Sequence, residues 1–136
     1  MKRFTLSFVL LGSLLLTEAA SGQGVLAKVP AVKVIQLDTQ GKDYLPLLGG
    51  PPETVTMRSG LVVLAPGKSV GKHSTGTYEE VLVVLEGAGR MVITGGETLP
   101  VVAGTAVYCP PQREHDVHNT GQGDLRYVYI VAKARL

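Results

Sequence analysis

The sequence predicts an all-β fold, a small barrel or sandwich built as one domain from 136 residues. Glycine or proline stands at almost every junction between short apolar runs, at intervals of about 8–12 residues, which is typical of sandwiches and barrels. Beyond the first two dozen residues no stretch keeps a helical period of apolar positions. The runs themselves are rich in β-branched residues, which favour strands.

The N-terminus has the three-part pattern of a secretory signal peptide. Two basic residues precede an apolar run over residues 4–16, and small residues follow at 19–22. We expect a signal peptide over residues 1–22 and the folded domain over residues 23–136. The alternative is a membrane anchor, but the run is short of the ~20 residues that span a bilayer. The predicted localisation is therefore secreted or periplasmic.

Composition narrows the partners of the exported chain. Without Lys2, Arg3 and Glu18, the thirteen basic and eleven acidic residues become eleven and ten, a net charge of +1. This balance predicts no nucleic-acid partner and no membrane partner after signal removal. The one cysteine, Cys109, excludes an internal disulfide, so the apolar core must hold the fold.

The predicted elements follow the apolar runs in order. Residues 31–37 alternate weakly, and residues 38–52 form a glycine- and proline-rich loop. The continuous run 81–85 is predicted to form a hairpin with residues 90–94, which end at a Gly95-Gly96 turn. The other predicted strands are residues 60–65, 98–103, 105–109, 115–119 and 125–132.

All three histidines of the chain lie in two short segments. The segment 67–87 contains His73, and the segment 104–119 contains His115 and His118. Imidazoles and a carboxylate on neighbouring strands are the ligands that a divalent transition metal requires. The grouping therefore indicates a site.

Strand parity decides which of these side chains meet. His73 and Thr75 are two apart and share a face. A turn that contains Gly76 can return Glu80 beside them, whereas Glu79 faces the other way and is expected at the solvated rim.

The same parity separates the other two histidines. His115 and Asn119 share one face of their strand, while His118 lies on the opposite one. We expect His118 in an outer layer and not among the ligands.

These segments resemble the paired motifs of the single-domain cupins, G-(X)5-H-X-H-(X)3–4-E-(X)6-G and G-(X)5-P-X-G-(X)2-H-(X)3-N. Two positions depart, because Thr75 replaces the second histidine and Gln112 replaces a glycine. The resemblance implies a conserved double-stranded β-helix barrel of six to eight strands from about Val29 onward, with the site inside its open end. The matched positions are Gly67, His73, Glu80, Gly87, Gly104, Pro110, His115 and Asn119.

The resemblance leaves His73, Glu80 and His115 as candidate ligands, since a threonine hydroxyl is a weak donor. Two imidazoles and one carboxylate suit iron, manganese, nickel or zinc and leave positions open for water or a bidentate substrate. The alternative is a hydrogen-bonded remnant that has lost its metal.

The other candidate residues are expected to pack in the fold and not to take part in catalysis. Cys109 is expected to be a small buried hydrophobe, because no activating pattern surrounds it. Tyr78 and Tyr108 flank the two motifs, and Tyr127 and Tyr129 share a face of the last strand; tyrosines in barrels commonly pack. Motifs for serine hydrolysis and nucleotide binding are absent from the sequence.

Three function classes follow. The favoured one is an exported, metal-binding cupin with a small-molecule ligand; the alternatives are a dioxygenase, isomerase or lyase, and a metal-free binding or structural barrel. Whether the protein is an enzyme stays open. The resemblance also implies a homodimer, and residues 31–37, an apolar strand with few local partners, would be the edge that a second copy covers.

Overall fold

The computed structural model describes residues 29–134 and consists of strands and their connections. None of the residues in that range forms a helix that is long and apolar enough to cross a bilayer. The predicted all-β fold is confirmed. The strands are β1 (Tyr44–Gly49), β2 (Arg58–Leu64), β3 (Tyr78–Glu86), β4 (Ala88–Ile93), β5 (Thr98–Val102), β6 (Ala106–Cys109), β7 (His115–Asn119) and β8 (Leu125–Lys133).

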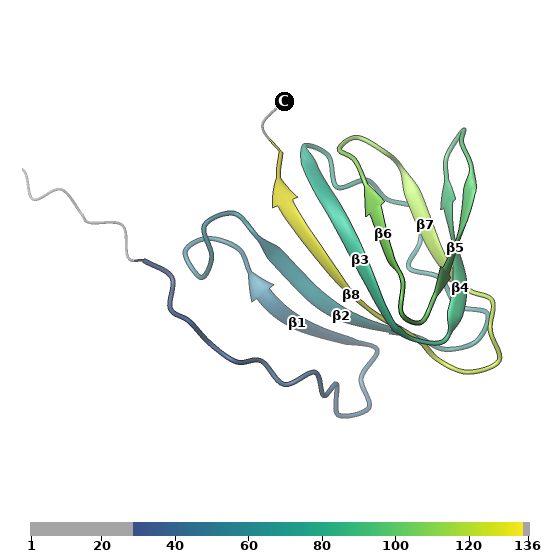
Figure 1. Cartoon of the computed structure of the whole chain (residues 1–136), viewed down its shortest axis with the longest axis horizontal. Coiled ribbons are helices and arrows are strands. Elements are labelled where there is room, and N and C mark those ends of the chain that lie inside the picture. The colour runs from purple at the N-terminus through teal and green to yellow at the C-terminus, as the bar shows by residue number, and fades with distance from the viewer. Residues whose placement is uncertain (1–28, 135–136) are drawn as a thin grey trace, which may run out of the picture.

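The strands form two antiparallel sheets (Figure 1). The first has five strands in the order β1-β2-β8-β3-β6, and the second has three in the order β5-β4-β7. The C-terminal strand β8 lies between β2 and β3, so the last element of the chain completes the centre of the larger sheet.

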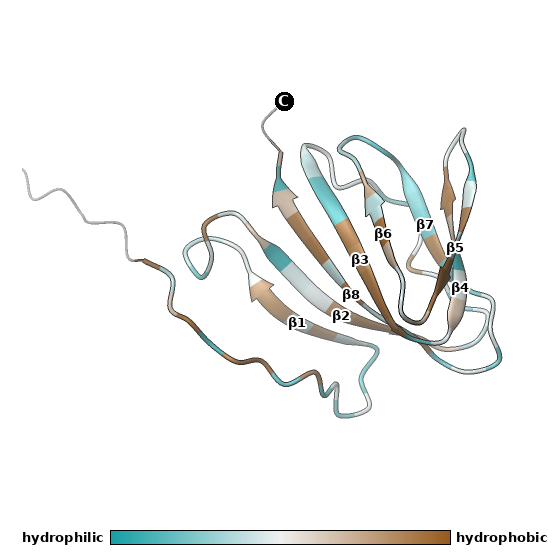
Figure 2. Cartoon of the chain, viewed as in Figure 1, coloured by the Kyte–Doolittle hydropathy of each residue, from teal (hydrophilic) through white to brown (hydrophobic). Residues whose placement is uncertain are grey.

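The apolar core lies between the two sheets. In β3, Leu82 and Val84 are buried while Val83 and Leu85 are exposed, the alternation of a strand with one buried face. Figure 2 shows apolar residues concentrated along β3 and β8. Each fully buried aliphatic side chain stabilises the fold by about 1.5–3 kcal/mol. The cluster contains Leu64, Leu82, Val84, Met91, Ile93, Val101, Val117, Leu125 and Tyr127.

The hairpin predicted between residues 81–85 and 90–94 is wrong. Strand β4 pairs with β5 and β7 in the other sheet, and the predicted Gly95-Gly96 turn connects β4 to β5. The chain crosses between sheets at Gly87, whose φ is 82°. A Cβ there would lie 2.3 Å from the carbonyl oxygen of Asp124, so only glycine permits this crossing.

The loop predicted over residues 38–52 contains strand β1. Strand β1 pairs with β2, with a shift in register between Pro46 and Leu48. Because β1 is the edge of its sheet, a proline without an N–H donor is tolerated there. Pairing with β2 therefore forms a strand here, although the glycine and proline residues locally favour a loop.

The strand predicted over residues 31–37 is also wrong, since these residues pair with no described strand. They form an arm, in which Val32 and Val34 are exposed. Arg126 donates to the carbonyl of Leu37 at 3.4 Å. Arg126 and Tyr127 are neighbours on β8 and point to opposite faces; because Tyr127 is in the core, this contact holds the arm at the outer face of the large sheet.

Asn119 has a structural role at the end of β7. The side chain is 2% exposed, and its amide donates to the carbonyls of Leu64 at 2.7 Å and Gly123 at 2.8 Å. Its own carbonyl accepts from the Gly121 N–H at 2.9 Å. Asn119 therefore joins the ends of β2 and β7, and its inward face agrees with the parity prediction.

Gln112 occupies a left-handed conformation, with φ of 62°. Its backbone N–H donates to the Gly76 carbonyl at 2.7 Å, which ties the segment after β6 to the turn before β3. The position favours glycine because a Cβ is strained in this region. This explains physically why the cupin motif has glycine here.

We predict that Gln112→Gly raises the free energy of unfolding by up to about 1 kcal/mol. Relief of the left-handed strain is worth ~1–2 kcal/mol, and the added chain entropy of glycine offsets part of it. Urea unfolding would measure the change. Gln122→Gly, at an exposed position without positive φ, is the matched control and should destabilise. Equal destabilisation by both variants would contradict the prediction.

Candidate metal centre

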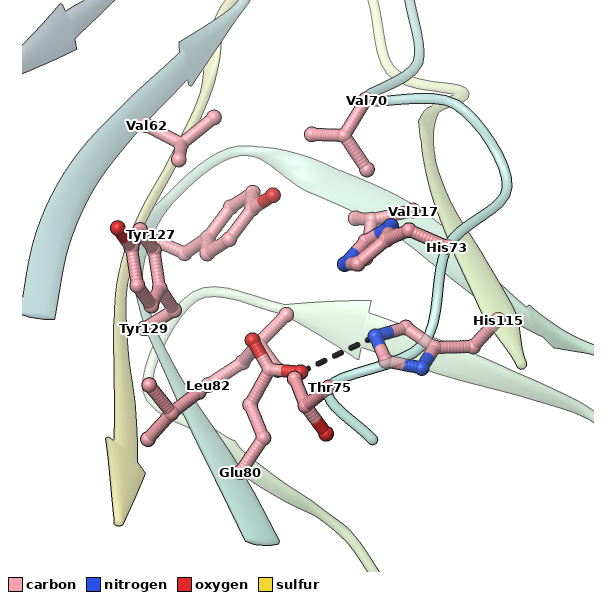
Figure 3. A pocket seen from close by; sticks show the side chains of 11 residues that line it. Val62, Val70, His73, Thr75, Glu80, Leu82, His115, Val117, Tyr127 and Tyr129 are labelled. Atoms are coloured by element: carbon pink, nitrogen blue, oxygen red, sulfur yellow. Dashed lines mark ion pairs between the residues drawn. The ribbon is translucent and has the colours of Figure 1, made fainter. Parts of the chain in front are cut away.

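A cavity of about 380 Å³ lies among the strands that carry the two motifs (Figure 3). Strands β2, β3 and β8 of the large sheet and β7 of the small sheet form its walls, together with residues 70–75. The lining is apolar apart from a few polar groups. The lining residues are Val62, Val70, His73, Thr75, Glu80, Leu82, His115, Val117, Tyr127, Tyr129 and Val131.

A single antiparallel bridge brings His73 beside His115. The His73 N–H donates to the His115 carbonyl at 2.9 Å, and the His115 N–H donates back at 2.8 Å. Their ring centroids are 4.5 Å apart. The backbone therefore fixes the spacing of the two imidazoles, although 42 positions separate them in the sequence.

Glu80 reaches the same place from the other sheet. It lies on β3 opposite Cys109 of β6 and is 5% exposed. A turn precedes it, in which the Tyr78 N–H donates to the Thr75 carbonyl at 3.1 Å. The Thr75 hydroxyl donates to the Tyr78 carbonyl at 2.7 Å. Thr75 lines the cavity, but it serves the turn that positions Glu80.

Hydrogen bonds orient both imidazoles. The Nδ1 atom of His73 is 2.8 Å from the Gly71 carbonyl, and that of His115 is 3.0 Å from the Arg113 carbonyl. A carbonyl accepts, so each Nδ1 carries a proton and donates. In the neutral rings, each Nε2 then has a free lone pair for a metal.

The ligand atoms of His73, Glu80 and His115 all lie within 4.8 Å of one another. His115 Nε2 and Glu80 Oε2 are 3.1 Å apart, as the dashed line in Figure 3 marks. Both atoms are nevertheless buried without a hydrogen-bond partner. Two buried electron-rich atoms aimed at each other cost free energy unless a cation or a proton lies between them. The predicted trio therefore fits a metal ion.

Burial and charge set the protonation of the neighbouring groups. The Glu80 carboxylate raises the pKa of His115 above its ordinary 6.5; burial opposes this, and the Arg113 carbonyl supports it. Burial also raises the pKa of Cys109. Cys109 is 1% exposed, and its thiol is 3.4 Å from His115 Nδ1, so the predicted buried hydrophobe is confirmed and the thiol stays protonated.

Four other sequence candidates, His118, Tyr78, Tyr108 and Glu79, are not among the residues that line the cavity. His118 is half-buried, with Nε2 3.1 Å from Asp116 Oδ2, as expected for an outer layer. Tyr108 is exposed and its hydroxyl donates to Glu79 at 3.2 Å, so Glu79 lies away from the site as predicted. The guanidinium of Arg58 lies 6.0 Å from the Tyr78 ring centroid.

Sequence reasoning missed the contribution of β8 to the cavity. Tyr127, Tyr129 and Val131 alternate along this strand and line the cavity together. The alternation was visible in the sequence, but it did not reveal that this face meets the histidines.

Comparison with known proteins agrees with this architecture. The profile of the family described as "Cupin domain" matches residues 60–131, which include both motif segments. An oxalate-binding protein of Thermotoga maritima is 31% identical over 68 residues. That match covers 50% of this chain and 55% of the relative, so the chain spans about half the length of that protein.

Solved structures support the fold. A Cupin 2 conserved barrel domain protein from Salinispora arenicola is 24% identical with a TM-score of 0.63, covering 76% of this chain and 91% of that one. A double-stranded β-helix cupin from Methanocaldococcus jannaschii is 18% identical with a TM-score of 0.62, covering 75% and 91%. The predicted double-stranded β-helix is confirmed.

We predict that the metal-free protein loses stability as pH rises above 6.5, the ordinary pKa of His115. The folded pKa of His115 lies above its ordinary 6.5. The stabilisation that protonated His115 gives the folded state is therefore fully present below pH 6.5 and is lost as pH rises through its folded pKa. Urea unfolding of chelator-treated protein at about pH 6 and about pH 8.5 would detect the fall.

The variant His115→Gln should reduce this pH dependence, whereas His118→Gln, in the outer layer, should retain it. An unchanged pH dependence in His115→Gln would show that the titrating group is another residue.

Proposed function

The chain belongs to the cupin domain family, and from this premise we propose that its barrel binds one divalent transition metal ion. His73, Glu80 and His115 would be the protein ligands. A small molecule with oxygen donors would complete the coordination from within the cavity.

The observation that carries this proposal is the pair of buried, unpartnered atoms His115 Nε2 and Glu80 Oε2. Nothing else in the described cavity wall satisfies them, and the His73 imidazole lies beside them. A metal ion would be shared by all three groups and would remove the cost of burying the free lone pairs.

The donor set also favours a particular range of metals. Two imidazoles and one carboxylate match iron, manganese, nickel and zinc better than calcium or magnesium, which prefer oxygen. When bound, such an ion acts as a Lewis acid toward a coordinated oxygen. The oxygen-donor ligand is supported by the similarity to a protein named for oxalate binding.

We propose in addition that the protein acts outside the cytoplasm, as a secreted or periplasmic protein. Support comes only from the signal-like sequence of residues 1–22, which lie outside the described residues.

The homodimer also stays a proposal, and the structure changes the contact that supports it. The arm has no strand partner among residues 29–134, and Val32 and Val34 are 102% and 88% exposed. Val83 and Leu85 are exposed as well, on the face of β3 opposite its core face. A second copy would bury these side chains against each other, so we propose that the arm and this outer face form the contact.

We predict that the domain of residues 23–136, purified without an affinity tag, binds about one transition metal ion per chain. His115→Ala should weaken binding by ~100-fold or more, because it removes one of only three protein ligands. Elemental analysis after reconstitution, and competition with a colorimetric chelator, would measure stoichiometry and affinity.

The matched control is His118→Ala, which removes an imidazole from the outer layer and should leave metal affinity unchanged. Equal losses in the two variants, or substoichiometric metal that His115→Ala does not alter, would contradict the metal centre.

We predict that light scattering at micromolar concentration gives twice the mass of the chain. The double variant Val32→Asp/Val34→Asp should be monomeric, because two unpaired carboxylates would be buried in the contact. Thr120→Asp/Gln122→Asp adds the same charge at exposed loop positions and should stay dimeric. A monomeric parent protein would reject the dimer.

A further inference from the structure

The cavity contains a single residue with a fixed charge. Glu80 is the one acid in its lining, and neither lysine nor arginine is among the described residues that form the wall. Apolar side chains supply most of the remaining surface, from Val62, Leu82 and Val117 among others. A charge inside such a cavity must be balanced locally, since the wall has no lysine or arginine, and its histidines are neutral when they bind a metal.

The proposed metal centre therefore fixes the charge of a suitable ligand. A divalent ion brings two positive charges, and Glu80 neutralises one of them; the two imidazoles bind as neutral groups. The net charge of +1 is cancelled by a monoanion. A dianion would leave a net charge of −1 among apolar side chains, without any lysine or arginine to compensate it.

Tyr127 supplies the second feature of the cavity. It lies on β8, is 3% exposed, and points its hydroxyl into the cavity (Figure 3). This hydroxyl makes none of the side-chain hydrogen bonds found among residues 29–134, whereas the Tyr129 hydroxyl is 2.8 Å from that of Tyr44. Among the described residues, Glu80 Oε2 and His115 Nε2 are the buried side-chain atoms without a partner, so the Tyr127 hydroxyl oxygen is accessible from the cavity and free to bond a ligand there.

The phenol is held in its neutral form. Burial raises the pKa of Tyr127 above its ordinary 10.0, and the Glu80 charge raises it further. A neutral phenol is a donor, so Tyr127 can donate one hydrogen bond to an anionic oxygen in the cavity.

Size and polarity limit the rest of the ligand. About 380 Å³ is at the low end of the range for small-molecule sites, ~300–1,000 Å³. Val62, Val70 and Val131 offer an apolar surface and no hydrogen bond from their side chains. A short aliphatic substituent would pack there favourably, whereas a second carboxylate would be desolvated without compensation.

We propose that the metal-loaded cavity selects a small monoanionic carboxylate that has a second oxygen donor at carbon 2 and a short aliphatic substituent. Two oxygens bind the metal, and Tyr127 donates a hydrogen bond to the carboxylate. This inference rests on the proposed metal centre and makes Tyr127 the residue that determines specificity. It also separates this chain from the relative named for binding oxalate, which is a dianion.

The test uses the domain loaded with Zn²⁺, which has no redox chemistry. Equilibrium dialysis would measure lactate, propanoate and oxalate bound per chain, with zinc content assayed in each sample. Acid concentrations are kept in the range where the zinc content is unchanged. We expect lactate to bind at least ~10-fold more tightly than oxalate, and propanoate to bind more weakly than lactate because it lacks the second oxygen donor.

Variants identify the role of the phenol. Tyr127→Phe should weaken lactate binding by about 10-fold or more without loss of zinc, since it removes one hydrogen bond to a charged group. Tyr108→Phe makes the same change on the exposed surface and should bind lactate normally.

The outcomes separate the two proposals. A protein that takes up no zinc before any acid is added would overturn the metal centre and this inference with it. Full zinc uptake with oxalate bound as tightly as lactate would overturn the monoanion selectivity alone. Full zinc uptake with unchanged lactate binding in Tyr127→Phe would remove the role of Tyr127.

Discussion

The contact between Glu80 and His115 is the constraint on which the site depends. Glu80 belongs to the large sheet and His115 to the small one, so their approach to 3.1 Å requires the two sheets to pack face to face. Both groups are buried, and neither has a hydrogen-bond partner for the atom that faces the other. The fold thus concentrates an electrostatic cost at one place, where a shared cation or a proton can relieve it.

The electrostatic cost of burying Glu80 and His115 together links the stability of the fold to whether a metal ion or a proton lies between them. Without metal, a proton on His115 stabilises the pair, and the raised pKa of this residue expresses the same attraction. A metal ion must displace that proton, because ligation requires the free lone pair. Occupancy by metal and by proton are therefore alternatives, and rising pH favours the metal. Metal binding would restore the stability that the folded state loses when His115 is deprotonated.

The two departures from the cupin motifs have different physical consequences. Gln112 keeps the left-handed backbone of the usual glycine, so its cost is strain in a loop and leaves the ligands in place. Thr75 changes the site itself, because its hydroxyl is committed to the Tyr78 carbonyl at the turn before Glu80. The proposed centre would therefore have three protein ligands and coordination positions open to a small molecule. In our proposal, the apolar wall and the Tyr127 phenol would decide which molecule fits.

The sequence alone determined the all-β class, seven of the strands to within a few residues, and the candidate trio, because strand parity and motif spacing are local properties. It failed where long-range pairing decided the outcome. Strand β1 forms within a glycine- and proline-rich segment because β2 pairs with it, and the apolar residues 31–37 find no such partner. The bridge between His73 and His115 and the facing of Tyr127 into the cavity join residues far apart in the chain. Only the packing of the two sheets brings these groups together, because no local sequence pattern shows which strand faces enclose the same cavity.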